Sequence, residues 1–430
     1  MQAGDWLLGD FWGPMHDETR LFPEHVTTGP EAPLASRSRS PALPSKSRWP
    51  LSAARAKTGP SISPSRPRSA SPHPITTTPP SRRSAIIRAM PLPRCHCAVR
   101  RWAHGGTAAP YNVAAGRTTA MRQDIEFKSE GVTCRGWLTT PDEGSGPFPT
   151  VIMAGGWCYT REIVMPHYAE FFHRGGLATI IFDYRNFGAS DGRRRQHLDP
   201  RAQIEDYKNA ISFAETRPQV DPDRIGVWGI SYSGGHSLIV GATDPRVKAI
   251  VSNVAVVDGF ENMTRVHGER KFRELQQLIA QDRERRFKGD PTEGYIAMSS
   301  PDPDHELATW NYPEVYKVFM HLKETEAPLH EHRSTIESVE LLLDYTVFPF
   351  LRRIVDIPTL MIVAEADNIT LWDKEIEVFN QLPTTKKKLF VLPQISHMTL
   401  YSQKSALELA AQEAVEWFRT YLHADVLVPV

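Results

Sequence analysis

Ser231 lies in a sequence context that favours nucleophilic chemistry. It follows a β-branched, apolar run at residues 224–229 and precedes a glycine-rich segment. Two small residues flank it at a distance of two positions, Gly229 before it and Ser233 after it. This spacing is typical of a nucleophile elbow, a sharp strand-to-helix turn that pushes the serine hydroxyl out above the sheet. Because a serine hydroxyl reacts only when a base removes its proton, we expect a histidine and an acid elsewhere in the chain.

The motif departs from the strict G-x-S-x-G pattern, because Ser233 takes the place of its last glycine. Ser233 is therefore an alternative nucleophile, with Ser231 and Gly235 as its small neighbours. The apolar run ends at Ile230, which places Ser231 in the turn and Ser233 already in the following helix. We predict Ser231 as the nucleophile. A glycine-serine loop without chemistry is the remaining interpretation.

The elements that must position these residues begin after Met121, where strand-like and helical patterns alternate. Short apolar runs separated by amphipathic helices predict a mostly parallel sheet covered by helices on both faces. Eight expected strands, with the Ser231 turn after the fifth, fit an α/β-hydrolase fold. The strands are expected at residues 123–128, 133–139, 150–154, 178–183, 224–229, 247–252, 359–363 and 388–392, and the principal helices at residues 163–174, 201–216, 235–242, 371–381 and 405–422.

The alternation of strands and helices stops between residues 256 and 355. This charged and aromatic stretch is expected to form a helical cap inserted between the sixth and seventh strands, with residues 121–255 and 356–430 as the core. Two sets of apolar residues are expected to pack the cap helices, and one or two of them to face the substrate. The first set is Phe272, Leu275, Leu278 and Ile279, and the second is Trp310, Tyr312, Tyr316, Phe319 and Met320.

In such a fold the acid follows the seventh strand and the histidine follows the last one. His397 lies after the eighth expected strand and before the closing helix, so we predict it as the base. Asp367 comes just after the seventh strand, and its carboxylate is expected to hold the imidazole tautomer and stabilise the imidazolium. Glu365 is the alternative acid, although it falls closer to the end of the strand.

Acyl transfer also requires hydrogen-bond donors for the oxyanion that develops on the carbonyl group. One expected donor is the backbone N–H of Tyr232, the residue after the nucleophile. The second is the backbone N–H of Trp157, in the loop after the third strand, where Gly155 and Gly156 allow the backbone to approach closely. A plain strand-to-helix turn is the alternative interpretation of these two glycines.

The loop after the fourth strand contains Arg185 and Asp191 in a polar, glycine-rich setting. Turn chemistry of this kind after a buried strand usually organises the loop itself. We therefore expect Arg185 and Asp191 to have a structural role.

Residues 1–120 differ from the rest of the chain in composition. They contain 17 of the 35 prolines, and residues 32–120 contain 15 Lys and Arg but no Asp or Glu. We expect a disordered extension, because such a segment buries too little apolar surface to offset its loss of entropy on ordering. Its basic character loosely resembles an organelle transit peptide, although the first 31 residues carry six acidic groups. A wrongly assigned start codon, with Met121 as the true beginning, is the other interpretation.

The remaining composition excludes several classes of function. From Met121 onward, 34 basic and 44 acidic residues give a net charge of −10, which argues against nucleic-acid binding. No apolar stretch approaches the roughly 20 residues of a membrane span. The four cysteines form neither a disulfide framework nor a zinc motif, which is typical of reduced thiols in an intracellular, cytoplasmic protein. These cysteines are Cys95, Cys97, Cys134 and Cys158.

With these residues assigned, the chain resembles the polyketide transferase family of α/β hydrolases, which are found beside polyketide synthases in fungal secondary metabolism. The resemblance covers most of the chain between residues 121 and 422 and is weakest in the cap. It implies a serine hydrolase or acyltransferase in which Ser231, Asp367 and His397 carry the family's catalytic roles. Similar cores occur in general esterases and S15-type peptidases. The resemblance rests on residues 154–162, 184–192, 195–200, 204–215, 221–235 and 245–253.

The expected function is acyl transfer from an ester or thioester, with a polyketide chain as the implied acyl group. No metal or organic cofactor is expected. A small acyl substrate, and a carrier domain of a polyketide synthase if the donor is carrier-bound, are the expected partners, and the oligomeric state stays open. A general carboxylesterase and a non-catalytic binding protein on the same fold are the alternatives.

Overall fold

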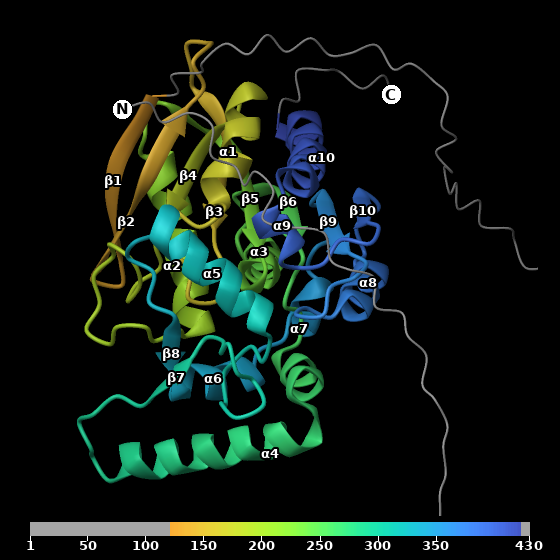
Figure 1. Cartoon of the computed structure of the whole chain (residues 1–430). Helices are drawn as coiled ribbons and strands as arrows, with labels where there is room; N and C mark the ends of the chain where they lie inside the picture. Colours follow the sequence, from red (N-terminus) through yellow and green to blue (C-terminus); the bar gives the residue numbers. More distant parts are fainter. Residues whose placement is uncertain (1–120, 423–430) are drawn as a thin grey trace, which may run out of the picture. The chain divides into compact units, whose positions relative to one another are not determined.

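The computed structural model describes residues 121–422 of this chain (Figure 1). Residues 1–120, for which we expect a disordered extension, and residues 423–430 lie outside the described residues. Cys95 and Cys97 also fall there, whereas Cys134 and Cys158 are buried free thiols. No helix among the described residues is both long and apolar enough to cross a membrane.

One eight-stranded sheet forms the centre of the described part, and its strand order is β1-β2-β4-β3-β5-β6-β9-β10. Only β2 runs antiparallel to its neighbours, and all other pairs are parallel. This arrangement confirms the α/β-hydrolase fold expected from the sequence. The strands are β1 (Met121–Ser129), β2 (Val132–Thr140), β3 (Phe148–Ala154), β4 (Ala178–Phe182), β5 (Val220–Ile230), β6 (Val247–Asn253), β9 (Thr359–Ala364) and β10 (Lys387–Leu392).

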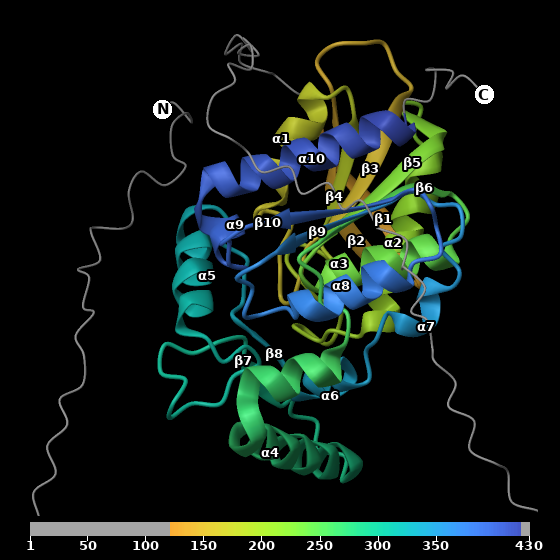
Figure 2. The same ribbon diagram turned by 90° about the vertical axis from the view of Figure 1, so that its right-hand side faces the viewer.

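Helices cover both faces of the sheet, as fully apolar parallel strands require. Figure 2 shows α1 and α10 on one face and α2, α3 and α8 on the other. The central strands β3, β4, β6 and β9 are buried along nearly their whole length. The helices are α1 (Met165–Arg174), α2 (Pro200–Glu215), α3 (Tyr232–Thr243), α8 (Trp372–Gln381), α9 (Thr399–Ser402) and α10 (Lys404–Leu422).

The chain between β6 and β9 forms the expected insertion, which lies beyond the ends of β5, β6 and β9 (Figure 1). It is mainly helical, but the short antiparallel pair β7 and β8 corrects the expectation of helices alone. Three-residue strands carry too little pattern to be recognised in a sequence. The insertion comprises α4 (Gly259–Phe287), β7 (Tyr295–Ala297), α5 (Pro313–Thr325), β8 (Arg333–Thr335), α6 (Ile336–Leu343) and α7 (Phe348–Leu351).

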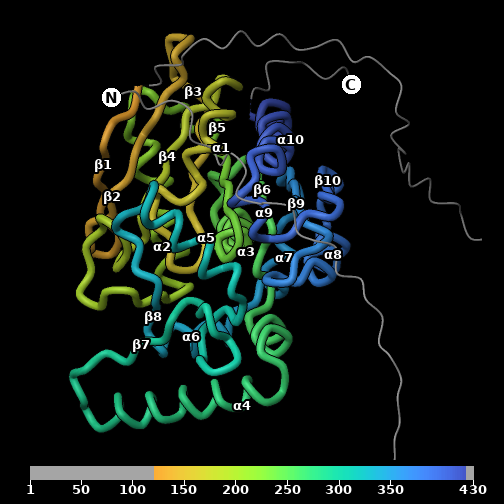
Figure 3. The backbone as a smooth tube through the Cα atoms, viewed as in Figure 1, coloured from red at the N-terminus to blue at the C-terminus, as the bar shows by residue number. Residues whose placement is uncertain are grey.

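The topology places three strand ends together. The loops that follow β5, β9 and β10 all leave the same edge of the sheet, because these strands are parallel. Figure 3 traces these connections from β5 into α3, from β9 toward α8 and from β10 toward α9. Residues far apart in the sequence therefore meet at this edge.

Candidate active site

Ser231 occupies the turn between β5 and α3, because β5 ends at Ile230 and α3 begins at Tyr232. Its backbone has φ 58° and ψ −121°, a strained conformation for a residue other than glycine. The last residue of β6 and the segment after it hold this strained residue from both sides. The Ser231 N–H donates to Asn253 O at 2.9 Å, and Ser231 O accepts from the Val256 N–H at 3.1 Å.

Ser233 lies inside α3 and has no exposed surface. Its hydroxyl donates to the carbonyl oxygen of Gly155 and accepts from the hydroxyl of Tyr184 at 2.7 Å. These bonds tie α3 to the loop after β3. The geometry therefore favours Ser231 over Ser233 as the nucleophile.

His397 and Asp367 lie side by side at this edge of the sheet. His397 Nδ1 lies 2.7 Å from Asp367 Oδ2, and both side chains are buried. The other carboxylate oxygen, Asp367 Oδ1, accepts from the backbone N–H groups of Ile369 and Thr370, each at 2.8 Å. A carboxylate accepts the Nδ1 proton, so Nε2 of the neutral imidazole is left free to act as a base.

Glu365, the alternative acid, does not reach the histidine. It is exposed, and its Oε2 accepts from the backbone N–H of Gln394 at 3.1 Å. The strand β9 ends at Ala364, so Glu365 is the first residue of the loop and Asp367 the third. The two positions diverge because the chain turns between them.

The two expected oxyanion donors come from the residue after Ser231 and from the loop after β3. Tyr232 is the first residue of α3, so its N–H is among those at a helix start that lack an intrahelical acceptor. Trp157 lies in the loop after β3, and its ring packs against the ring of Tyr232 with centroids 5.2 Å apart. Gly156 allows this loop to approach the nucleophile, since a Cβ there would lie 2.8 Å from the Cβ of Ser231. The close approach, rather than a plain turn, accounts for the glycine at this position.

Tyr159 is a candidate functional residue that the sequence reasoning missed. Its side chain interacts with the side chains of Ser231 and Tyr401, and the Tyr401 ring stacks on His397 with centroids 5.4 Å apart. Burial raises the pKa of the Tyr159 phenol well above its usual value, so the group is neutral and able to donate a hydrogen bond. Its place in the same loop as Trp157 was the available signal, but nothing in its spacing marks it.

Replacing Tyr159 with Phe is expected to lower kcat by about fivefold to tenfold, the effect of removing one donor beside the reacting serine. The aromatic packing is kept, so the melting temperature should change little. Steady-state kinetics on a p-nitrophenyl ester measure the effect. An unchanged kcat would show that the hydroxyl of Tyr159 has no part in the reaction.

The insertion holds the loop of Trp157 through a chain of imidazole groups. His330 Nδ1 donates to Cys158 O at 3.0 Å, and His330 Nε2 accepts from His332 Nδ1 at 3.1 Å. His332 Nε2 in turn accepts from the hydroxyl of Ser299 at 2.7 Å. Burial lowers the pKa of His330 to about 3 and that of His332 to about 4. Both rings are therefore neutral at pH 7, as this pattern of donors and acceptors requires.

These buried histidines predict that the protein loses stability in mild acid. Their folded-state pKa values lie below the ordinary value of 6.5, so the unfolded chain binds more protons between those limits. The free energy of unfolding is therefore expected to fall as the pH drops below about 6.5. Urea titrations at pH 7 and pH 5 measure this, with a smaller difference expected for His332→Gln. If the free energy of unfolding differed between pH 7 and pH 5 by the same amount in both proteins, His332 would not be a neutral buried histidine of this kind.

Two of the aromatic residues expected in the cap contact the site. Trp310 packs edge-on against Trp157 with ring centroids 6.2 Å apart, and Phe319 lies 5.1 Å from the ring of Tyr159. Both are almost completely buried. They identify the part of the insertion that contacts the loop after β3.

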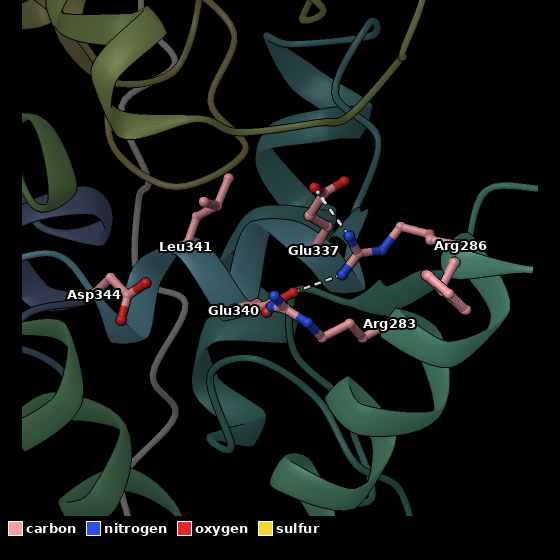
Figure 4. A pocket seen from close by; sticks show the side chains of 7 residues that line it. Arg283, Arg286, Glu337, Glu340, Leu341 and Asp344 are labelled. Atoms are coloured by element: carbon pink, nitrogen blue, oxygen red, sulfur yellow. Dashed lines mark hydrogen bonds and ion pairs between the residues drawn. The ribbon is translucent and has the colours of Figure 1, made fainter. Parts of the chain in front are cut away.

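A separate cavity of about 450 Å³ lies between α4 and α6 (Figure 4). Four of its five charged side chains pair with one another, because Arg286 pairs with Glu337 at 3.1 Å and both Arg286 and Arg283 pair with Glu340. None of the proposed reacting residues lines it. The lining residues are Arg283, Arg286, Phe287, Glu337, Glu340, Leu341 and Asp344.

Arg185 and Asp191 make the contacts expected of structural residues. Arg185 pairs with the buried Asp206 at 2.7 Å, and Asp191 pairs with Arg135 at 2.6 Å. Between residues 121 and 422, no group of three or more His, Cys, Asp or Glu side chains is arranged to hold a metal ion.

The sequence of this chain matches a known family. The family model described as X-Pro dipeptidyl-peptidase (S15 family) matches residues 130–399, more than half of the chain. The chain belongs to this family. The matched residues span the sheet from the end of β1 to the start of α9.

Fungal enzymes are among the proteins similar in sequence to this S15-family chain. It is 30% identical over 277 residues to a thiohydrolase of Eupenicillium brefeldianum, covering 63% of this chain and 86% of the relative. It is 27% identical over 306 residues to the polyketide transferase af380 of Aspergillus fumigatus, covering 70% and 99%. The resemblance to polyketide transferases expected from the sequence is thereby confirmed.

A solved structure shows the same fold. The structure of DcsB in complex with its substrate analogue matches with a TM-score of 0.61 and 24% identity, covering 70% of this chain and 100% of that chain.

Proposed function

We propose that this protein is a serine-dependent acyltransferase or hydrolase that takes an acyl group from a thioester or ester. The observation that carries the proposal is the buried bond between His397 and Asp367, at the sheet edge where Ser231 sits in a strained turn. A serine, a histidine and a carboxylate at one edge of the sheet are the groups that acyl transfer through a serine uses.

The proposed reaction has two steps. His397 Nε2 takes the proton of the Ser231 hydroxyl, and the serine oxygen forms a bond to the carbonyl carbon. The N–H groups of Trp157 and Tyr232 stabilise the oxyanion, and its collapse breaks the bond to the leaving thiolate or alkoxide, which receives the proton from His397. In the second step His397 takes a proton from water or an alcohol, whose oxygen forms a bond to the acyl carbon. The bond between that carbon and the Ser231 oxygen then breaks, and the serine oxygen receives the proton from His397.

The acyl group is proposed to be a polyketide chain. The names of the thiohydrolase and polyketide transferase relatives support a thioester donor and a polyketide substrate. Residues 256–355 are proposed as the cap that bounds the acyl site, with Trp310 and Phe319 as its contacts to the oxyanion loop and Tyr159. A carrier domain of a polyketide synthase is the proposed partner if the donor is carrier-bound.

Parallel assays of acyl thioesters and short p-nitrophenyl esters, each with and without an alcohol acceptor, test this function. The proposal predicts a higher kcat/KM for long acyl thioesters and a transfer product when alcohol is present. A preference for short esters with hydrolysis alone would indicate a general carboxylesterase. Binding without turnover would indicate a non-catalytic protein on the same fold.

A further inference from the structure

Glu375 on α8 is a carboxyl group without exposed surface that the proposed reaction does not use. Its two oxygens bind two different segments of the chain. Oε2 accepts from the backbone N–H of Ala255 at 2.8 Å, and Oε1 accepts from the hydroxyl of Thr370 at 3.3 Å. Burying a carboxyl group costs free energy, so the position of Glu375 between two loops calls for an explanation.

The first segment that Glu375 binds is the one that holds the nucleophile. Ala255 lies between Asn253, whose carbonyl accepts from the Ser231 N–H, and Val256, whose N–H donates to Ser231 O. A shift of Ala255 would therefore move both backbone bonds that hold the strained turn.

The second segment is the one that holds the acid. Thr370 binds Glu375 through its hydroxyl and donates its backbone N–H to Asp367 Oδ1 at 2.8 Å. Asp367 in turn bonds to His397. Glu375 thus lies two hydrogen bonds from the carboxylate that orients the base.

The surroundings of Glu375 favour the uncharged acid. Burial, followed by the negative charge of Asp367, raises the pKa of Glu375 well above its usual value. Asp373 also faces it, and Arg265 pairs with that carboxylate at 2.8 Å on the outer side. In the uncharged acid one of the two oxygens carries a proton, and no second negative charge then lies beside Asp367.

We propose that Glu375 is a positioning residue that joins the loop holding Ser231 to the loop holding Asp367. It thereby keeps the nucleophile and the base in their relative positions. The inference rests on the proposed function. Glu375 touches no substrate in this role; it acts through Ala255 and Thr370. Its contribution is to the geometry of the reacting groups, where small displacements are costly.

Three variants test the inference on the full chain. Glu375→Leu removes both bonds, Glu375→Gln keeps a neutral group of the same shape, and Val378→Ala removes buried contacts one turn further along α8. Glu375→Leu is expected to lower kcat on a p-nitrophenyl ester by about 10-fold to 100-fold, with KM changed by less than about twofold. Glu375→Gln is expected to recover kcat to within about threefold, with the acidic limb of the kcat/KM profile in the same place.

The control separates positioning from stability. Val378→Ala is expected to lower the melting temperature while kcat stays within about twofold of the wild type. The inference is overturned if Glu375→Leu keeps its kcat, if Val378→Ala loses as much activity for an equal loss of stability, or if Glu375→Gln moves the acidic limb to lower pH.

The rate of labelling by a fluorophosphonate probe separates this inference from the proposed function. We expect the probe to label the wild type, and to label the Glu375→Leu protein more slowly. Equal labelling rates in the two proteins would overturn the role of Glu375 alone. A wild type that does not label at Ser231 would overturn the proposed function and this inference together.

Discussion

Replacing Ser231 with Ala is expected to lower kcat by about four to six orders of magnitude, because the acyl-enzyme then has no oxygen on which to form. The removed hydroxyl is not a core contact, so the variant should fold. Its melting temperature and far-ultraviolet circular dichroism should match the wild type. Kinetics on any ester or thioester that the wild type turns over measure the loss.

Ser233→Ala is the matched control. Its hydroxyl holds Gly155 and accepts from Tyr184, so its loss loosens the loop after β3 without removing the nucleophile. We expect its kcat to fall by less than about 100-fold. A Ser231→Ala protein with full activity, or a Ser233→Ala protein without any, would reverse the assignment.

Asp367→Asn is expected to lower kcat by about 10⁴-fold, because an amide in this place favours the wrong imidazole tautomer. The side chain keeps its shape, and its oxygen still accepts from the N–H groups of Ile369 and Thr370. The amide nitrogen then faces His397 Nδ1 and turns its proton to the other ring nitrogen. The measurement is kcat at pH 8, with the unfolding temperature as a check on the fold.

Glu365→Gln is the control for the acid. Glu365 is exposed, and its side chain accepts a hydrogen bond from the backbone N–H of Gln394, so kcat should stay within about twofold of the wild type. Loss of activity in this variant together with an active Asp367→Asn protein would assign the acid to Glu365.

Much of the fold could be predicted, because the spacing of apolar residues indicates which face of a helix or strand is buried. The β-branched run before Ser231 and the amphipathic pattern at α2 identify their elements within a few residues. The start of β5 was missed, because Val220 pairs with Phe148 ahead of an irregular stretch that contains Pro222. Proline disfavours a strand interior, so the sequence understates the length of this strand.

The positions in the candidate site could be predicted where topology alone decides them. Ser231, Asp367 and His397 each follow the end of a strand in the sheet, and parallel strand ends meet at one edge. The choice between Asp367 and Glu365 depends on how the chain turns after β9. The sequence alone does not show that turn, because both positions carry a carboxylate.

Contacts across the insertion could not be predicted. His330 and Cys158 are 172 positions apart, and no periodic pattern connects them. Tyr159 and Glu375 are likewise recognised by what they touch in space. Side chains that act through a neighbour carry no sequence signal of their own.

Mass spectrometry of the protein after reaction with a fluorophosphonate tests the central claim most directly. The account predicts one adduct, on the peptide that contains Ser231, with fragment ions that place it on Ser231 and not on Ser233. Labelling should be lost in Ser231→Ala and strongly slowed in a His397→Ala protein. An adduct on another residue, or labelling at the same rate without His397, would contradict the account.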